Sequence, residues 1–409
     1  MTSECSTEET KKDVPFDRNF FDEIIDRKNS SAIKYDYAKR RGIPDDALPM
    51  WVADMDFRSP PCINEAIAER ARHGIYGYSD ATPEYFSAVQ NWYRTRYAYH
   101  IDDCNIVTSP GIVFGLYTAI AALTREGDSV LIQRPVYYPF SSAIKDLRRK
   151  LVNSPLVYRD GQYSIDFDDF ERKITENGVR LFILCNPHNP VGRVWTREEL
   201  LKLGEICIAH DVYIVSDEIH SDFVYQGHEH IIFASLTAEL AQRTITCTAP
   251  SKTFNLAGLQ ISNLFIQNEA IRKQYYDAMK RTGYSQPNLM GMIACRAAYE
   301  RGAPWLDALR LYLQGNLQFV RESLDMDFPG VRLVEPEGTY LVWLDFSGLG
   351  LEDDKLKEKI ETRCGLWLDH GSMFGPEGSG FQRINIACPR AILAEALERL
   401  KKGIYSSEI

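Results

Sequence analysis

Ser216-Asp217-Glu218-Ile219-His220 and Ala249-Pro250-Ser251-Lys252-Thr253-Phe254-Asn255 are the two stretches of sequence that decide the fold. Each directly follows a short apolar run typical of a buried strand. If the two runs are consecutive parallel strands, their carboxyl ends bring Asp217 and Lys252 to one edge of the sheet. A carboxylate and a lysine in one crevice suit pyridoxal phosphate (PLP), because the amine forms a Schiff base and the acid keeps the pyridine nitrogen protonated. The spacing therefore predicts a PLP site.

Strand-like and helix-like segments alternate from about residue 111 to residue 266. One helix is expected to begin after Thr196, because Glu199 three residues later completes a capping box, and to end near His210. This alternation favours an α/β unit with a mostly parallel sheet that is buried on both faces. The expected strands are 129–133, 180–185, 212–216 and 244–248, and the other expected helices are 113–124 and 141–149.

The C-terminal part has a different, α+β texture. Residues 331–334 and 339–344 form a hairpin-like pair, and a further strand is expected at 382–387 and a helix at 389–402. A long helix at 305–324 is expected to join this part to the rest. We therefore expect four segments: a disordered tail (1–15), a segment that joins the small domain (16–58), a large PLP-binding domain (59–300) and a small C-terminal domain (301–409).

Composition excludes several classes of function. The chain has 409 residues, 44% hydrophobic and 25% charged, which allows a large core. A net charge of −10 argues against nucleic-acid binding. The nine cysteines contain no C-x-x-C pair, which favours a reducing, cytoplasmic location and no metal site. Residues 1–15 lack the apolar region of a signal peptide, and no apolar run approaches the length of a membrane span.

Both residues of the predicted pair have ordinary alternative interpretations. Most lysines are solvated surface charges, but Lys252 lies between a buried-looking strand and the apolar residues Phe254 and Leu256. Such surroundings lower the pKa of the amine and leave it free for imine formation. Asp217 can also simply cap a following helix. Spacing alone leaves these alternatives open.

Three further motifs lie at expected strand ends. The loop Asn186-Pro187-His188-Asn189-Pro190-Val191-Gly192 is a rigid turn whose side-chain amide can bind a ligand, or it is only a turn. Gly111 opens a helix whose N-terminus can hold a phosphate, although most helix N-termini hold no ligand. Tyr137 and Tyr138 follow a strand at a point where an aromatic ring can lie on a cofactor or pack in the core.

Taken together, these residues resemble the fold-type I PLP enzymes of the class I/II aminotransferase superfamily. Within it the chain is most similar to the MalY/PatB-type C–S β-lyases, from about Phe16 to the C-terminus. This resemblance implies a large domain with a mostly parallel seven-stranded sheet and a smaller α+β domain. Its specific motifs are Leu48 to Phe57, His73 to Tyr78, Asn186 to Gly192, Ser216 to His220, Ser251 to Gln260 and Gly380 to Asn385.

The resemblance also implies a role for individual residues. Lys252 forms the Schiff base and removes the substrate Cα proton, and Arg383 clamps the substrate carboxylate. Tyr78 reaches the phosphate from a partner subunit, which implies a homodimer. The remaining cofactor contacts are Asp217 at the ring nitrogen, Asn189 and His220 at the ring hydroxyl, Tyr137 on the ring, and Ser251 with the amides of Ile112 and Val113 at the phosphate.

The sequence departs from the aminotransferase pattern at three positions. Gln260 stands where many aminotransferases have a phosphate-binding arginine, and Ala249 stands where a serine is common. Phosphate binding must therefore depend on backbone amides, Ser251 and Tyr78. Tyr35 replaces a tryptophan that is usual among the relatives.

The favoured activity is β-elimination from L-cystathionine, L-cysteine or another S-substituted cysteine, giving a thiol, pyruvate and ammonia. An aminotransferase shares the early steps and remains the first alternative. A biosynthetic lyase that acts on a cysteine conjugate is a variant of the favoured activity. A PLP-fold protein with a regulatory role is the remaining alternative, against which the intact Lys252, Asp217 and Arg383 argue.

Overall fold

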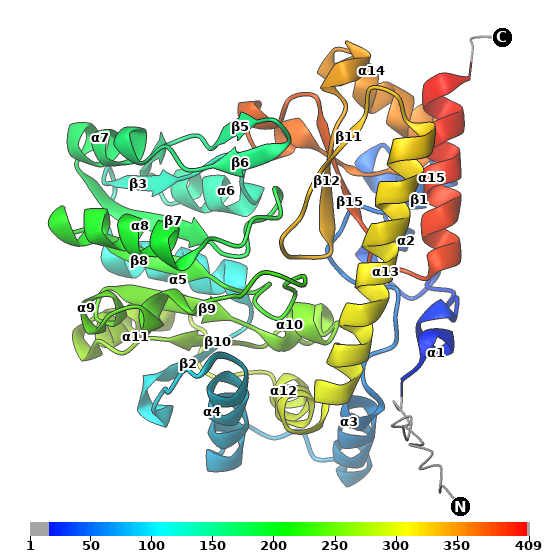
Figure 1. Ribbon diagram of the computed structural model, residues 1–409. Helices are drawn as coiled ribbons and strands as arrows, with labels where there is room; N and C mark the ends of the chain where they lie inside the picture. The colour runs from blue at the N-terminus through cyan, green and yellow to red at the C-terminus, as the bar shows by residue number, and fades with distance from the viewer. Residues whose placement is uncertain (1–15, 407–409) are drawn as a thin grey trace, which may run out of the picture.

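The computed structural model describes residues 16–406 and is built around a seven-stranded sheet (Figure 1). The disorder expected for residues 1–15 lies outside the described residues. The strands of this sheet are β2 (Ile106–Ser109), β3 (Ser129–Ile132), β4 (Lys150–Asn153), β7 (Val179–Cys185), β8 (Tyr213–Asp217), β9 (Thr244–Thr248) and β10 (Ser262–Phe265). Their order is β2-β10-β9-β8-β7-β3-β4, and β10 runs antiparallel to both of its neighbours. The expected mostly parallel seven-stranded sheet is confirmed.

Helices cover both faces of this sheet, which explains why β3, β9 and β10 are buried along their whole length. Along β7 the side chains alternate between the faces, so that Leu181 and Ile183 pack with one cluster and Phe182 and Leu184 with the other. The first cluster includes α5 (Ile112–Leu123), α6 (Tyr138–Asp146) and α11 (Glu269–Arg281), and the second includes α7 (Phe167–Asn177), α8 (Arg197–Ala209) and α9 (Ala238–Ala241).

The capping box of α8 is confirmed, because Thr196 and Glu199 make both of its hydrogen bonds. The range predicted for α6 was wrong by three residues at each end. Pro139 occupies the first turn, where a proline needs no N–H partner, so the helix begins earlier than predicted. It ends before Arg148, whose φ of 58° is left-handed, and the chain then enters β4, which the sequence analysis did not predict.

The C-terminal part contains a four-stranded antiparallel sheet in the order β11-β12-β15-β14. Its strands are β11 (Arg332–Val334), β12 (Leu341–Asp345), β14 (Asp369–His370) and β15 (Phe381–Asn385), and its helices are α14 (Asp353–Glu358) and α15 (Arg390–Tyr405). The expected hairpin, the later strand and the final helix are all present within a few residues of their predicted positions. Two small pairs complete the strands: β5 (Val157–Arg159) with β6 (Gln162–Ser164), and β1 (Leu48–Pro49) with β13 (Leu366–Trp367).

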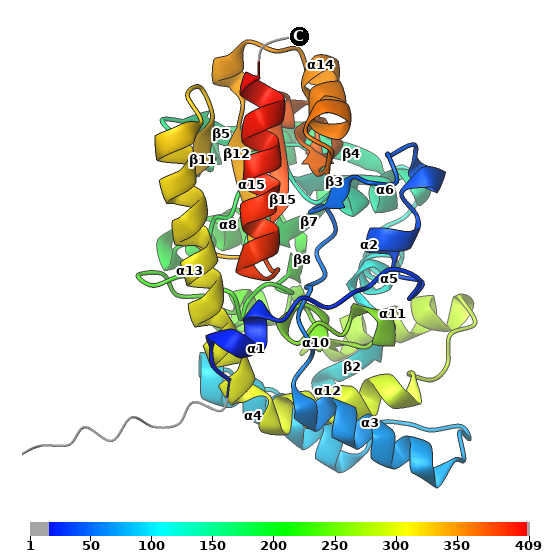
Figure 2. The same cartoon turned by 90° about the vertical axis from the view of Figure 1, so that its right-hand side faces the viewer.

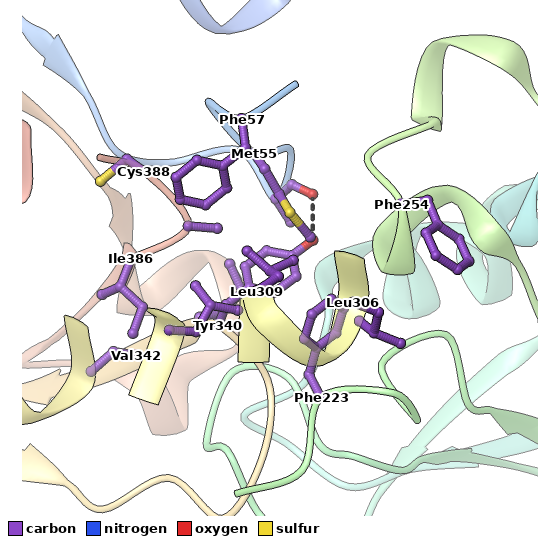
Figure 3. Close-up of a cluster of buried hydrophobic side chains, with 14 of the residues drawn as sticks. Met55, Phe57, Phe223, Phe254, Leu306, Leu309, Tyr340, Val342, Ile386 and Cys388 are labelled. Carbon is purple, nitrogen blue, oxygen red and sulfur yellow. Dashed lines mark hydrogen bonds between the residues drawn. The ribbon is translucent and has the colours of Figure 1, made fainter. Parts of the chain in front are cut away.

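The two sheets are joined by α13 (Ala303–Asp327), which runs from α12 (Leu289–Arg301) to α15 (Figures 1 and 2). The other α-helices are α1 (Arg18–Asp22), α2 (Ile33–Asp36), α3 (Pro61–His73), α4 (Pro83–Tyr97) and α10 (Pro250–Thr253). Residues 50–57, here called the crossing segment, follow β1 and lead toward α3. Figure 3 shows Met55 and Phe57 of this segment in one apolar cluster with Tyr340, Leu309 and Phe254. This cluster is the core that connects the two sheets.

Among the described residues, no helix is both long enough and apolar enough to cross a membrane.

Candidate active site

A cleft of about 270 Å³ lies at the carboxyl ends of the central strands. Strands β7, β8 and β9 are parallel neighbours, so the loops that follow them meet at one edge of the sheet. Asn189, Asp217 and Lys252, one from each strand end, all line this cleft. The geometry inferred from the two opening stretches of sequence is confirmed.

Burial changes the charge states of both members of the predicted pair. It lowers the pKa of Lys252 to about 8, against the attraction of Asp54 and Asp217. It also raises the pKa of Asp217 to about 7, although the backbone N–H of Ile219 donates to this carboxylate at 3.2 Å. The lysine amine is therefore partly free near neutral pH, as the sequence analysis predicted.

Lys252 has a defined resting position in the cleft. Its Nζ donates to the carbonyl oxygen of Ala53 at 2.7 Å, and the hydroxyl of Tyr340 donates to the same oxygen at 3.0 Å. Ala53 belongs to the crossing segment, so this segment forms one wall of the site. The roles of Ala53 and Tyr340 could not be predicted from the sequence, because a backbone acceptor leaves no motif.

Two asparagine side chains hold the crossing segment in place. Asn385 Nδ2 donates to the carbonyls of Val52 and Asp54, both at 2.7 Å. Asn255 accepts from the N–H of Met55 at 2.9 Å and donates to the carbonyls of Met55 and Phe57 at 2.9 and 3.1 Å. The backbone on both sides of Ala53 is therefore fixed from β15 and from the loop that follows α10, the helix of Lys252.

A buried ion-pair network fixes the acidic side chains of the same segment. Arg27 contacts Asp54 and Asp56 at 2.7 Å each, and Lys34 contacts Asp56 at 2.7 Å. Lys34 is only 1% exposed. The Tyr35 ring lies 5.4 Å from the Arg27 guanidinium and 5.9 Å from the Lys34 amine, so the residue that replaces the usual tryptophan also faces these cations. This network gives the Asp-Met-Asp-Phe motif a structural role.

The first turn of α5 forms the end of the cleft where a phosphate was predicted. Ile112 and Val113 line the cleft, and Gly111 before them has a φ of 140°, which favours glycine. Because Gly111 has no side chain, it cannot cap the helix, and the first N–H groups remain available for a ligand. Ser251 and Gln260 line the cleft with them, so the glutamine noted as a departure is itself a member of the site.

His220 and Tyr137 also line the cleft. Burial lowers the pKa of His220 well below its ordinary value, and the positive charges of Lys252 and Arg383 act in the same direction. Its buried Nδ1 makes no hydrogen bond to any described residue. The cleft thus offers a ligand a neutral imidazole, a carboxylate, an amide, an amine and helix N–H groups, and this set fits PLP and its phosphate.

Arg383 is buried beside the cleft but does not line it. Its Nη1 donates to Asn189 Oδ1 at 2.8 Å, its Nη2 donates to the carbonyl of Trp51 at 2.9 Å, and it forms an ion pair with Asp369. Its Nε makes no hydrogen bond to any described residue. Asp369 could not be identified as a partner of Arg383 from the sequence, because only the pairing of β14 with β15 brings the two residues together.

Tyr78 lies apart from the cleft of its own chain. It is 97% exposed, on the connection between α3 and α4, and it does not line the cleft. Its predicted contact with the phosphate of a second subunit stays a prediction.

Residues 48–400 match the family model of aminotransferase class I and II. The chain is 43% identical to the cystathionine β-lyase PatB of Bacillus subtilis (strain 168), over 94% of this chain and 99% of that protein. It is also similar to the solved structure of a PLP-bound C–S lyase from Staphylococcus hominis, with a TM-score of 0.89 and 36% identity over 94% of this chain and 98% of that one. A PLP-bound protein of Clostridium difficile 630, provisionally described as an aminotransferase, has a TM-score of 0.92 and 44% identity over 94% and 99% of the two chains.

The chain belongs to the aminotransferase class I and II family. Within this family, the predicted relationship to the PatB-type cystathionine β-lyases is confirmed. The expected fold type and the expected cofactor agree with these matches.

Proposed function

We propose that this protein is a PLP-dependent C–S β-lyase, which releases a thiol from an S-substituted L-cysteine and leaves pyruvate and ammonia. One observation carries the proposal: Lys252, with its lowered pKa, and Asp217 line one cleft in a chain that is 43% identical to a cystathionine β-lyase over nearly its whole length. When bound, PLP supplies an electron sink for the carbanion that forms at the substrate Cα.

The proposed contacts with PLP follow the lining of the cleft. The N–H groups of Ile112 and Val113 and the hydroxyl of Ser251 hold the phosphate, since the α5 N-terminus favours an anion. Asp217 holds the ring nitrogen, and Tyr137 lies against the ring. Asn189 and His220 contact the ring hydroxyl.

In the proposed reaction Lys252 first carries the cofactor and then takes the Cα proton of the substrate. A pKa of about 8 suits both roles, because an amine of this kind is available as a base near neutral pH. The Ala53 carbonyl gives the freed amine a place to rest at 2.7 Å. Arg383 already contacts Asn189, Trp51 and Asp369. It holds the substrate carboxylate through the guanidinium N–H groups that these contacts do not use.

A panel of cysteine S-conjugates tests this function. Purified protein with PLP is incubated with L-cystathionine, L-cysteine and S-alkyl cysteines, and pyruvate and thiol are measured together. Equal amounts of both products from at least one substrate are expected, and none from the Lys252→Ala variant. Protein that retains PLP but yields no pyruvate from any of these substrates contradicts the proposal. The panel also identifies the preferred thioether.

Aminotransfer is the second candidate function, because the similar Clostridium difficile protein is provisionally described as an aminotransferase. The two reactions differ in where the proton goes after it leaves Cα. An aminotransferase converts an added keto acid to an amino acid and releases no thiol. Measuring both products in the same reaction mixture therefore separates the two candidates.

A homodimer that shares its active sites is also part of the proposal. Tyr78 is almost fully exposed, with Ile75 and Tyr76 exposed nearby, which suits a surface covered by a second copy. Mixing two variants that each impair the active site tests the sharing. If Tyr78 acts across the interface, a dimer of one Tyr78→Phe chain and one Lys252→Ala chain has one site with neither defect. Activity then returns on mixing. If both residues act within one chain, activity does not return.

We further propose a large PLP-binding domain at residues 59–300 and a small domain formed by residues 16–58 and 301–409. The pairing of β1 with β13 supports this division, because it attaches the N-terminal segment to the C-terminal part. A cytoplasmic location is proposed as well. Eight cysteines among the described residues are free thiols, which suits a reducing compartment.

A further inference from the structure

Lys252 lies on a helix that is too short to be stable by itself. The helix α10 has only four residues, and such a short helix is unstable unless other parts of the protein support it. Its direction decides where the Lys252 amine lies in the cleft. The contacts of the next residue, Thr253, are therefore important for the chemistry of Lys252.

Thr253 is anchored by a buried carboxylate from a different loop. Its hydroxyl donates to Asp222 Oδ2 at 2.6 Å, and the hydroxyl of Tyr97 donates to Asp222 Oδ1 at 2.6 Å. Thr253 is 1% exposed and Asp222 is 6% exposed. Both carboxylate oxygens are thus held by hydroxyl groups, in hydrogen bonds that the charge of Asp222 strengthens.

Asp222 does not belong to the cleft. It lines a separate cavity of about 180 Å³ with Tyr97 and His230, and the residues that line the cleft do not include it. It lies two residues after His220 and five after Asp217, on the loop that follows β8. A buried carboxylate costs free energy unless it is well bonded, so its presence at this junction needs a reason beyond packing.

We infer that Asp222 is a positioning residue: through Thr253 it fixes α10, and so Lys252, relative to Asp217 at the end of β8 and His220 on the loop that follows. The inference rests on the proposed function only in taking Lys252 as the residue that binds PLP covalently. Asp222 itself does not line the cleft in which the cofactor is proposed to bind.

A set of matched variants tests this role. Thr253→Val keeps the shape but removes the hydroxyl, Thr253→Ser keeps the hydroxyl, and Tyr97→Phe removes the other donor to the same carboxylate. Asp222→Asn removes the charge. For each variant, cofactor-free protein is mixed with PLP, attachment to Lys252 is trapped with borohydride at successive times, and the modified peptide is quantified by mass spectrometry.

Thr253→Val and Asp222→Asn are expected to slow attachment by about tenfold to a hundredfold, as misplacement of a reacting group does. Thr253→Ser should stay close to the wild-type rate, and Tyr97→Phe should have a smaller effect than Thr253→Val. In the holoenzyme forms of Thr253→Val and Asp222→Asn, kcat should fall while KM for the amino acid stays the same. If Asp222→Asn does not fold, the comparison of Thr253→Val with Thr253→Ser still tests the inference.

Equal rates for Thr253→Val and Thr253→Ser overturn the inference. An equal loss in Tyr97→Phe and Thr253→Val also overturns it, since the carboxylate then serves only general stability. If the wild-type protein attaches PLP at Lys252 but forms no pyruvate, the proposed function fails and the attachment rates still test Asp222. If the wild-type protein attaches no PLP at Lys252, the proposed function and the inference about Asp222 both fail.

Discussion

The two walls of the cleft are built in different ways. One wall, the strand-end wall, consists of Asn189, Asp217 and Lys252, each within a few residues of a strand of the same sheet. The other wall is the crossing segment, held by polar side chains that are distant in sequence. The first wall needs a correct sheet, whereas the second needs both sheets and the N-terminal segment to be in place. A single substitution should therefore disturb the crossing segment more easily than the strand-end wall.

The largest expected effect comes from the ion-pair network of the crossing segment. Lys34→Met leaves Asp56 buried with one cation fewer, and breaking a buried pair in this way costs about 3–5 kcal/mol. Denaturant unfolding of the two proteins measures the loss. Arg58→Ala is the matched control, because its ion pair with Glu23 is exposed to solvent and should contribute little to stability. Equal losses in the two variants contradict the importance of the buried network.

Loss of the amide contacts of the crossing segment should destabilise the protein less than loss of the ion pairs, and its effect should be confined to this segment. Asn385→Ala leaves the carbonyls of Val52 and Asp54 without their donor, at a cost of about 1–3 kcal/mol. Hydrogen exchange should then rise in residues 52–57 and stay unchanged in β8. Asn255→Asp gives a second test, since it keeps the acceptor for Met55 and removes both donated bonds. An equal rise in hydrogen exchange over the whole chain would argue against a local role for these contacts.

The pH dependence of cofactor attachment tests the strand-end wall. Below its pKa of about 8, Lys252 carries a proton and cannot attack an aldehyde. The attachment rate of PLP should therefore rise by about tenfold per pH unit up to this value and level off above it. Trapping at a series of pH values gives the midpoint. A rise that continues toward the ordinary lysine value contradicts the lowered pKa.

The smallest expected effect lies far from the crossing segment. Thr196→Ala removes the N-cap of α8, which packs on the central sheet, and should cost about 1 kcal/mol. Thermal unfolding measures this loss, while covalent attachment of PLP to Lys252 should be unchanged. A slower attachment would show that the strand-end wall is less independent of its supporting helices than proposed.

The same contrast explains what the sequence could predict. β8 and β9 were predicted to within a residue because both are short runs rich in β-branched or aromatic residues, and their order along the chain then placed Asp217 and Lys252 at one edge. The capping box of α8 was visible because its two residues are close in sequence. Gln260 was noticed only as a departure from a pattern, although it lines the cleft.

The missed residues depend on contacts between distant parts of the chain. Ala53 acts through its backbone, Tyr340 reaches it across 287 positions, and Asp369 meets Arg383 through strand pairing. Asp222 looks like one more polar residue of a loop until Thr253 is placed beside it. None of these contacts has a local periodicity or spacing from which it could be inferred.

The contact between Arg383 and Asn189 has a consequence for ligand chemistry. A guanidinium has only donors, so the amide oxygen of Asn189 must face it, as the 2.8 Å contact requires. The amide NH₂ is then the end of the side chain that remains for a ligand. Asn189 therefore favours a ligand oxygen that has lost its proton over one that still carries it. An arginine outside the cleft thereby sets the polarity of a group inside it.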